Sequence, residues 1–237
     1  MQSPGDIPVL STGQMVEVDR LMIEEYKITL IQMMENAGRN LAELARRISG
    51  GQVSGRSIAI LSGAGNNGGG GLVAARHLHN WGAEVSLVLA FEPARLKEVP
   101  AHQWHILQKM GIKLDEEPGL GKADLIIDAL VGYGLSGDPR QPVAGWIDQA
   151  NNSGNPILAL DAPSGLHTTS GTPGNPCIKA AATLTLALPK SGLLTPQAAG
   201  YVGELYLADI SVPSEIYRQI DVEVPNMFEV DTILKVN

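Results

Sequence analysis

The sequence predicts an α/β fold in which a mostly parallel central sheet is covered by helices on both faces. Six short apolar runs, rich in Val, Ile, Leu and Ala, have the length and composition of buried strands. The segments between most of them are long enough for crossover helices, which parallel strands require. Glycines and polar residues stand where several runs end, and ligands bind at strand ends in such sheets.

The elements follow in order along the chain. Apolar residues recur at helical spacing between Met15 and Leu44, with an interruption at residues 27–29, and this pattern predicts two amphipathic helices. The strands are expected at residues 56–63, 83–90, 124–132, 156–163, 182–189 and 204–211. Crossover helices are expected at residues 71–81 and 101–110. Near-continuous apolar strands of this kind suit a sheet buried on both faces.

Composition restricts the class of protein. The chain has 237 residues, 44% of them hydrophobic, which predicts one domain with a sizeable core. Its net charge of −8 argues against binding to DNA or to an anionic membrane, and favours a small-molecule partner. The first residues lack a secretory signal pattern, Cys177 has no second cysteine to pair with, and no apolar stretch is long enough to span a bilayer. We therefore expect a cytoplasmic protein.

The first strand is followed by a glycine-rich segment, "GAGNNGGGGLVAARHL", at residues 63–78. Glycines there permit positive φ angles and a close approach of ligand to backbone N–H groups, and a helix expected to start near Leu72 directs its positive end to the same place. The segment is therefore a candidate anion or phosphate cradle. A G-x-G-x-x-G pattern can be read at Gly63, Gly65 and Gly68, and Glu92 stands where a dinucleotide oxidoreductase has its ribose-binding acid, so that alternative stays open.

Two aspartates stand at the ends of apolar strands. Asp128 lies in "DALVGYGLSGDPR" and Asp161 in "LDAPSGL". A carboxylate in such a position needs a hydrogen-bonding or charged partner. Each could merely cap a turn through backbone N–H groups, but the glycine-rich loops beside both of them favour a functional site.

Five runs of residues resemble those of a known family. The runs "MMENAGRNLAE", "GAGNNGGGGLVAARHL", "DLIIDALVGYGLSG", "LDAPSGL" and "GELYLADISVP" occur in the order and at roughly the spacing seen in the YjeF amino-terminal domain family, the NAD(P)HX epimerases. The resemblance extends over residues 11–213. It implies a Rossmann-like three-layer α/β/α sandwich that interconverts the R and S forms of NADHX and NADPHX, in repair of nicotinamide nucleotides hydrated at carbon 6.

The resemblance also implies a set of site residues. Asn67, Asp128 and Ser164 correspond to the ligands of a potassium ion, and they offer the oxygen atoms that a hard cation requires. Asp161 corresponds to the acid–base catalyst, and Lys190 in "ALPKSG" could orient it, contact a phosphate, or be a solvated loop residue. The substrate contacts correspond to Asn66, Asn67, Gly68, Gly69, Gly70, Gly132, Tyr133, Gly134, Leu135, Ser136, Gly137, Asp138 and Asp161.

One position departs from the family pattern. The usual G-N-N-G-G-D-G has an acid where this chain has Gly70. Either Asp138 supplies a carboxylate from the facing loop, or the ligand has changed, or the domain is a catalytically impaired nucleotide-binding or scaffold module. An engineered substitution would produce the same sequence.

The remaining expectations concern partners and other reactive side chains. Family members commonly dimerise, and a separate NAD(P)HX dehydratase is expected because the chain carries no fused dehydratase domain after residue 213. The four histidines at residues 77–105 lack zinc-ligand spacing, and Cys177 has no neighbouring histidine, so neither group predicts a metal or nucleophile site.

Overall fold

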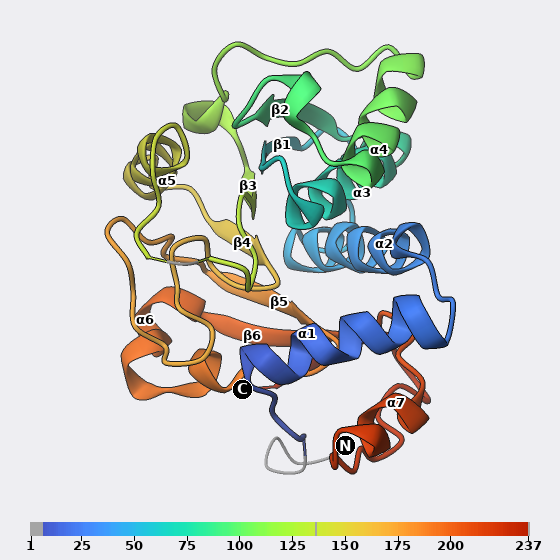
Figure 1. The fold of residues 1–237 in the computed structure, drawn as a ribbon. Coiled ribbons are helices and arrows are strands. Elements are labelled where there is room, and N and C mark those ends of the chain that lie inside the picture. The colour runs from blue at the N-terminus through green and yellow to red at the C-terminus, as the bar shows by residue number, and fades with distance from the viewer. Residues whose placement is uncertain (1–6, 136, 237) are drawn as a thin grey trace.

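A seven-stranded sheet forms the centre of the computed structural model, which describes residues 7–135 and 137–236 (Figure 1). The strand order is β2-β1-β3-β4-β5-β6-β7, in which β1 to β6 are parallel and β7 is antiparallel to β6. The strands are β1 (Ser57–Ser62), β2 (Glu84–Leu89), β3 (Leu125–Ala129), β4 (Ile157–Leu160), β5 (Ala182–Leu186), β6 (Glu204–Ala208) and β7 (Ile233–Lys235). The predicted α/β class and the six predicted strands are confirmed.

Helices cover both faces of the sheet (Figure 1). Side chains of α2, α3 and α4 form one core with the sheet, and α5 packs in a second core on the other face. A third core joins α1, α6 and α7 to β6 and neighbouring loops. The helices are α1 (Thr12–Arg20), the π-helical turn η2 (Leu21–Glu25), α2 (Leu30–Ile48), α3 (Asn66–Asn80), α4 (Glu98–Lys109), α5 (Val143–Asn152), α6 (Ala199–Val202) and α7 (Ser214–Gln219). Short 3-10 turns are η3 (Pro93–Arg95), η4 (Leu120–Lys122), η5 (Ser191–Leu194) and η6 (Pro196–Ala198).

Alternating side chains on the central strands fill both cores. In β1, Ile58 and Ile60 face the α2–α4 core, whereas Ala59 and Leu61 face the α5 core. Successive strand residues point to opposite faces, so a strand that is apolar throughout requires cover on both sides. The apolar strands therefore predicted a sheet covered on both faces, because each strand has apolar side chains on both sides.

The strand order places a switch point between β1 and β3. The chain passes from β1 to β2 on one side and then returns to add β3 on the other side. Loops leaving strands in opposite directions open a crevice beyond the carboxyl ends of the strands, where doubly wound sheets bind ligands. The glycine-rich segment leaves β1 and the Asp128 loop leaves β3, so both border this crevice.

The glycine-rich segment is helical, which corrects the expectation of a loop followed by a helix near Leu72. Helix α3 starts at Asn66 and includes all four consecutive glycines. None of these glycines is among the positive-φ residues; they serve close packing instead. A Cβ at Gly68 would lie 1.9 Å from the Gly63 carbonyl oxygen, and one at Gly71 would lie 2.6 Å from Ala129 Cβ.

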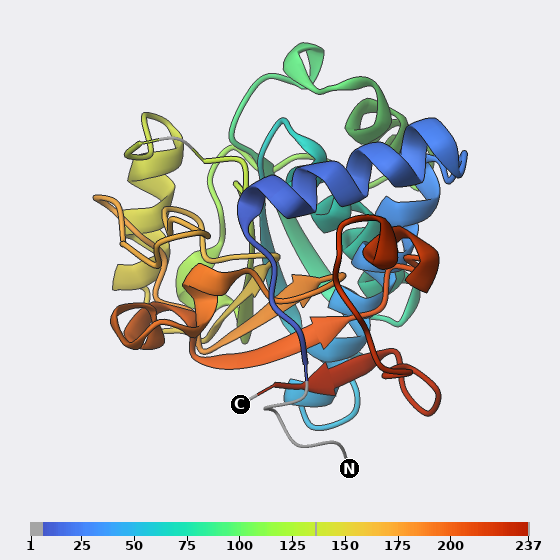
Figure 2. The same cartoon turned by 60° about the horizontal axis from the view of Figure 1, so that its bottom comes forward.

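The last strand was not predicted. β7 pairs with β6 through Ile233, Leu234 and Lys235, and lies beside β6 at the edge of the sheet in Figure 2. Three residues are too few for a strand to be distinguished by periodicity. Within the two described ranges, no helix is both long enough and apolar enough to cross a membrane.

Candidate functional site

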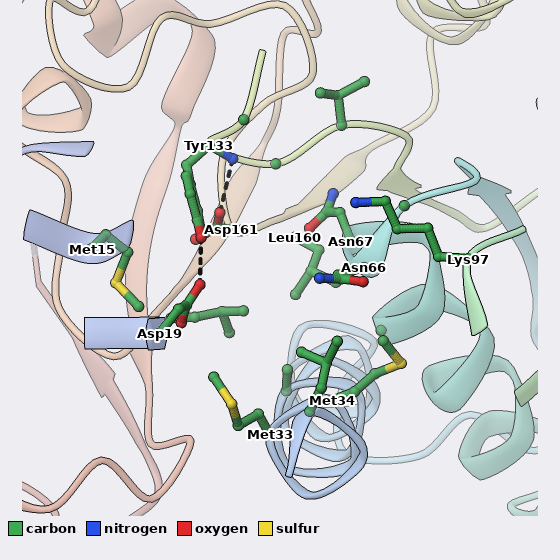
Figure 3. A pocket seen from close by; sticks show the side chains of 18 of the residues that line it. Met15, Asp19, Met33, Met34, Asn66, Asn67, Lys97, Tyr133, Leu160 and Asp161 are labelled. Atoms are coloured by element: carbon green, nitrogen blue, oxygen red, sulfur yellow. Dashed lines mark hydrogen bonds between the residues drawn. The ribbon is translucent and has the colours of Figure 1, made fainter. Parts of the chain in front are cut away.

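A cavity of about 460 Å³ lies at the crevice between the strand ends (Figure 3). Its walls come from the start of α3, the loop after β3, the end of β4, and Lys190 beyond β5, with α1 and α2 closing another side. Among the predicted substrate contacts, the lining residues are Asn66, Asn67, Gly70, Gly132, Tyr133, Gly134 and Asp161. Segments far apart in the sequence therefore meet at one cavity.

The amino-terminal end of α3 forms one wall. The N-cap residue Gly65 makes no side-chain capping hydrogen bond, so it leaves the first-turn N–H groups of the helix available to a ligand. Asn66 is exposed in this turn, and Asn66 and Asn67 both line the cavity. The helix dipole adds partial positive charge at the same place. This wall can accept an anionic or carbonyl group.

Asp161 is held at the cavity by two donors. Its Oδ1 accepts a 2.5 Å hydrogen bond from Lys190 Nζ, and its Oδ2 accepts one of 3.1 Å from the Tyr133 backbone N–H. Lys190 is fully buried and also donates to Thr185 Oγ1 (3.3 Å) and the Leu186 carbonyl oxygen (3.0 Å). The three donors of the ammonium group thus all have acceptors. Of the three interpretations of Lys190, the structure supports the one in which it orients Asp161.

The backbone of Asp161 is also unusual. Its φ angle is 67°, in the left-handed region that Asp and Asn tolerate better than most residues. Its N–H donates to the Leu184 carbonyl oxygen at 2.7 Å, which fixes the residue at the strand end. This geometry turns the carboxylate out of the sheet and toward the cavity.

Asp19 of α1 is a second carboxylate in the cavity, and the sequence analysis did not identify it. It lines the same space as Asp161, and the Tyr133 hydroxyl donates a short hydrogen bond to its Oδ2 (Figure 3). Burial raises the pKa of Asp19, although the hydrogen bond from Tyr133 opposes that shift. In the sequence, Asp19 lies among the charged residues of an amphipathic helix and has no distinguishing motif.

Asp128 and Ser164 form a buried pair outside the cavity lining. Ser164 Oγ donates to Asp128 Oδ1 at 2.6 Å, and the Ser164 backbone N–H donates to Oδ2 at 2.8 Å. Burial raises the pKa of Asp128 to about 6, and hydrogen bonds from Ser164 and Leu130 act in the opposite direction. The two predicted metal ligands from β3 and the β4 loop are therefore in direct contact.

Asn67, the third predicted metal ligand, lies between two backbone groups. With its amide nitrogen toward the Leu160 carbonyl oxygen (3.2 Å), its amide oxygen accepts from the Gly132 N–H (3.3 Å). Asn67 thus connects the start of α3 to the loop after β3 and to the end of β4. Over the part of the chain that the structure describes, no three His, Cys, Asp or Glu side chains gather as a metal site.

Other predicted contacts lie away from this cavity. Gly68 and Gly69 are buried against neighbouring elements, and a Cβ at Gly69 would lie 2.4 Å from Met34 Sδ. Asp138 is exposed, and its Oδ1 accepts from the Asn175 N–H at 2.9 Å. Leu135 and Gly137 are likewise outside the cavity lining, and Ser136 lies outside the described residues.

The alternative of a dinucleotide oxidoreductase depended on Glu92. Its side chain is exposed beyond β2 and lies outside the cavity lining, although the preceding residue, Phe91, is part of it. Cys177 is buried, and burial together with nearby Asp128 raises its pKa to about 12. Neither residue contributes a reactive group to the cavity.

The fold and the cavity define a doubly wound α/β protein with a ligand site at the switch point of its sheet. Residues 30–192 match the family model described as YjeF-related protein N-terminus. The chain therefore belongs to the YjeF amino-terminal family, the family of the NAD(P)H-hydrate epimerases, which are isomerases.

Individual relatives agree with this assignment. The chain is 41% identical over 220 residues to the NAD(P)H-hydrate epimerase of Dehalogenimonas lykanthroporepellens, covering 92% of this chain and 85% of the relative. It is 39% identical to the bifunctional NAD(P)H-hydrate repair enzyme Nnr of Moorella thermoacetica, covering 88% of this chain and 41% of that longer relative. The crystal structure of the yeast protein YNL200c superposes with a TM-score of 0.83 at 25% identity, covering 97% of this chain and 100% of the yeast chain.

Proposed function

We propose that this chain interconverts the R and S forms of NADHX and NADPHX in nicotinamide nucleotide repair. The relatives named NAD(P)H-hydrate epimerase support this reaction. The observation that carries the proposal is the placement of Asp161, whose carboxylate is oriented by Lys190 at the cavity of the switch point. A carboxylate held in this way can transfer a proton without first reorganising.

The reaction changes the configuration at carbon 6, which carries a hydroxyl group next to the ring nitrogen. The hydroxyl leaves and returns on the other face, or the ring opens and recloses; both routes move a proton at oxygen. Asp161 acts as the acid–base catalyst and its negative charge stabilises the cationic ring between the two forms. Lys190 positions Asp161, because it reaches the carboxylate and two acceptors below it.

The substrate binds along the wall made by α3 and the loop after β3. The start of α3 at Asn66 and Asn67 offers N–H groups and amide atoms, and residues 132–134 form the facing edge of the cavity. The predicted contacts at Gly68, Gly69, Leu135, Ser136, Gly137 and Asp138 remain part of this proposal.

A potassium ion bound by Asn67, Asp128 and Ser164 is the second part of the proposal. The fit rests on Asp128, which is fully buried and whose partners are the hydroxyl and N–H groups of Ser164 and the N–H of Leu130. A buried carboxylate with neutral partners is favourable for a hard cation, which prefers such oxygen donors. When bound, the ion would supply positive charge that balances the Asp128 carboxylate.

The direct test is epimerisation of purified (R)-NADHX and (R)-NADPHX with potassium present and an S-specific dehydratase as reporter. We expect turnover by the unmodified protein and its loss in Asp161→Asn. Absence of turnover, with binding of the hydrated nucleotides retained, would favour the alternative of a catalytically impaired binding module.

The proposal includes two partners. A dehydratase acts on the S form, as the bifunctional names of longer relatives suggest. A second copy of the chain is the other partner, because the amino-terminal helices carry exposed apolar side chains: Val16, Ile23, Tyr26 and Ile31. Sedimentation equilibrium should give a dimer, and Val16→Asp should weaken it.

A further inference from the structure

The cavity holds two carboxylates with different surroundings. Asp161 is paired with the Lys190 ammonium group at 2.5 Å. Asp19 instead accepts a hydrogen bond from the neutral Tyr133 hydroxyl. The next residue on α1, Arg20, is engaged by Glu17, Glu24 and Glu25. The cations near Asp19 are thus committed to other acids.

We propose that Asp19 is a second catalytic residue, the acid that protonates the departing hydroxyl, while Asp161 accepts the proton from the water that returns. This inference rests on the proposed epimerase function and assigns the two proton transfers to separate groups. Epimerisation by departure and return of water needs an acid on one side of the ring and a base on the other. Among the described residues, the cavity has one carboxylate in an ion pair and a second that is hydrogen-bonded to a neutral hydroxyl, and this arrangement meets that need.

Tyr133 fixes the relative position of the two acids. Its backbone N–H donates to Asp161 and its side-chain hydroxyl donates to Asp19, so one tyrosine residue contacts both carboxylates (Figure 3). All three residues line the cavity. A ring lying along this space has one acid toward each end of Tyr133.

The groups that surround Asp19 shift its equilibrium toward the protonated form. Burial is the largest influence and raises its pKa, as does the negative charge of Asp161, whereas the Tyr133 hydrogen bond and the Lys190 charge lower it. Tyr217 of α7 is also near enough for Asp19 to raise its pKa. Burial likewise raises the pKa of Tyr133, so its hydroxyl stays protonated and remains a donor.

The proposed step balances. The Asp19 proton passes to the hydroxyl oxygen on carbon 6, the carbon–oxygen bond breaks, water leaves, and the ring nitrogen lone pair forms an iminium bond to carbon 6. Water then adds to the opposite face, the electron pair returns to nitrogen, and Asp161 accepts the proton released by that water. Exchange with solvent restores both carboxyl groups. These reaction steps need no oxidant or reductant.

The test compares Asp19→Asn with Asp148→Asn, the same carboxyl-to-amide change at an exposed position of α5. Epimers are quantified by chromatography of quenched samples, against a sample without enzyme. We expect Asp19→Asn to lower kcat by about 100-fold or more, the range for general acid catalysis, with KM changed less than about threefold. Asp148→Asn should retain activity.

The pH profile separates acid catalysis from packing. In the unmodified protein, kcat/KM should fall as pH rises through the pKa of Asp19, because the acid loses its proton. Tyr133→Phe removes a hydrogen bond that lowers this pKa, so the alkaline limb should move to higher pH. Asp19→Asn should abolish that limb.

Two results would overturn the inference alone. They are an active Asp19→Asn protein with kcat within about threefold of the unmodified protein, and an alkaline limb that Tyr133→Phe leaves in place. If Asp19→Asn fails to fold, the pH dependence of kcat/KM of Tyr133→Phe tests the inference. An unmodified protein that does not epimerise either hydrated nucleotide would overturn the proposed function and this inference together.

Discussion

Gly70 lies directly against Leu160: a Cβ added to the glycine would come within 2.7 Å of Leu160 Cδ2. Both residues line the cavity, and Leu160 is almost fully buried immediately before Asp161. An aspartate at position 70, the residue expected from the family resemblance, would therefore meet a leucine side chain here. The glycine and the leucine are matched to one another, so this wall of the cavity is apolar.

Gly70→Asp should destabilise the protein by about 1–3 kcal/mol, the usual cost of overpacking. Leu160→Val shortens the opposing side chain, so the double variant should be less destabilised than the sum of the single variants, with a coupling of about 1 kcal/mol. Chemical denaturation of the four proteins measures this coupling. Gly121→Asp, at an exposed glycine with open space around it, is the control. Additive effects would contradict direct packing between positions 70 and 160.

Lys190→Met should destabilise the protein by about 3–5 kcal/mol, because it leaves the Asp161 carboxylate buried without its ammonium partner. Lys190→Met combined with Asp161→Asn removes both charges and should recover part of that loss. Lys235→Met breaks an exposed pair with Glu204 and should change stability by less than about 1 kcal/mol. Thermal and urea unfolding provide the comparison, and a Lys190→Met protein as stable as Lys235→Met would contradict the buried pair.

Cys177 should resist alkylation in the folded protein. Its pKa is raised from 9.0 to about 12, so at pH 8 the reactive thiolate is far rarer than in an unfolded chain. Because the folded pKa is raised, the protonated thiol contributes to the free energy of unfolding. This contribution is fully present below the unfolded pKa and is lost as pH rises through the folded pKa. Mass spectrometry after iodoacetamide treatment, with and without urea, measures the protection. Equal rates in both conditions would show that the thiol is not buried.

Potassium should raise the melting temperature of the protein more than sodium at equal ionic strength, because ligand binding to the folded state stabilises it. Asp128→Asn should remove this difference, since it replaces the charged ligand with a neutral one. Asp148→Asn, at an exposed position on α5, makes the same change of charge and should retain the response. An unchanged potassium response in Asp128→Asn would place the ion elsewhere.

The strand ends were predictable because they combine two separate signals. Asp128 and Asp161 each follow an apolar run, and parallel strands bring their carboxyl ends to one edge. The pairing of Asp161 with Lys190, 29 residues apart, could only be suggested, because position in the sequence does not fix the direction of a long side chain. Asp19 was missed for a related reason: its partner Tyr133 is 114 residues away.

The predicted start of α3, near Leu72, was wrong because glycine has low intrinsic helix propensity. Four glycines in succession therefore predicted a loop. In the structure, close packing of Gly68 on Gly63 and of Gly71 on Ala129 outweighs that propensity. The tertiary contacts that decide the matter are absent from the local sequence.

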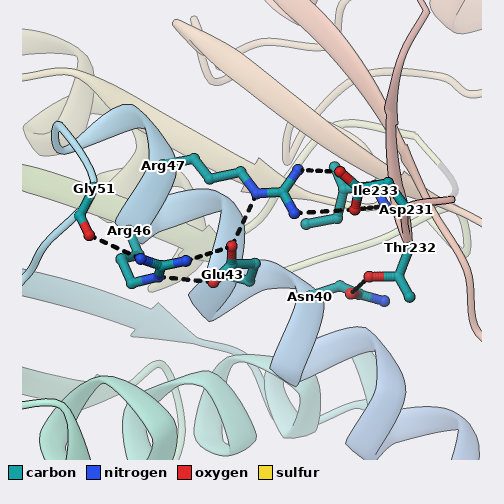
Figure 4. Close-up of polar contacts among 8 residues, drawn as sticks. All are labelled: Asn40, Glu43, Arg46, Arg47, Gly51, Asp231, Thr232 and Ile233. Atoms are coloured by element: carbon teal, nitrogen blue, oxygen red, sulfur yellow. Dashed lines mark hydrogen bonds and ion pairs between the residues drawn. The ribbon is translucent and has the colours of Figure 1, made fainter.

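The sequence did not predict β7, because contacts with residues far away in the sequence stabilise it. Arg47 of α2 makes paired hydrogen bonds of 2.8 and 3.0 Å to the Asp231 carboxylate (Figure 4). Thr232 Oγ1 donates to Asn40 Oδ1 at 2.8 Å. These contacts attach the residues before β7 to a helix almost two hundred residues earlier, and nothing in the local periodicity indicates them.

The antiparallel strand β7 has a consequence for how this molecule behaves among its own copies. β6 would otherwise present a row of unpaired peptide groups, a template on which an extended segment of another chain could assemble. With Ile233, Leu234 and Lys235 laid along it, that template is already used by the same chain. The charged side chain of Lys235 further disfavours pairing of another strand with the exposed edge of β7. Resistance to aggregation at this edge of the sheet thus depends on the three residues of β7.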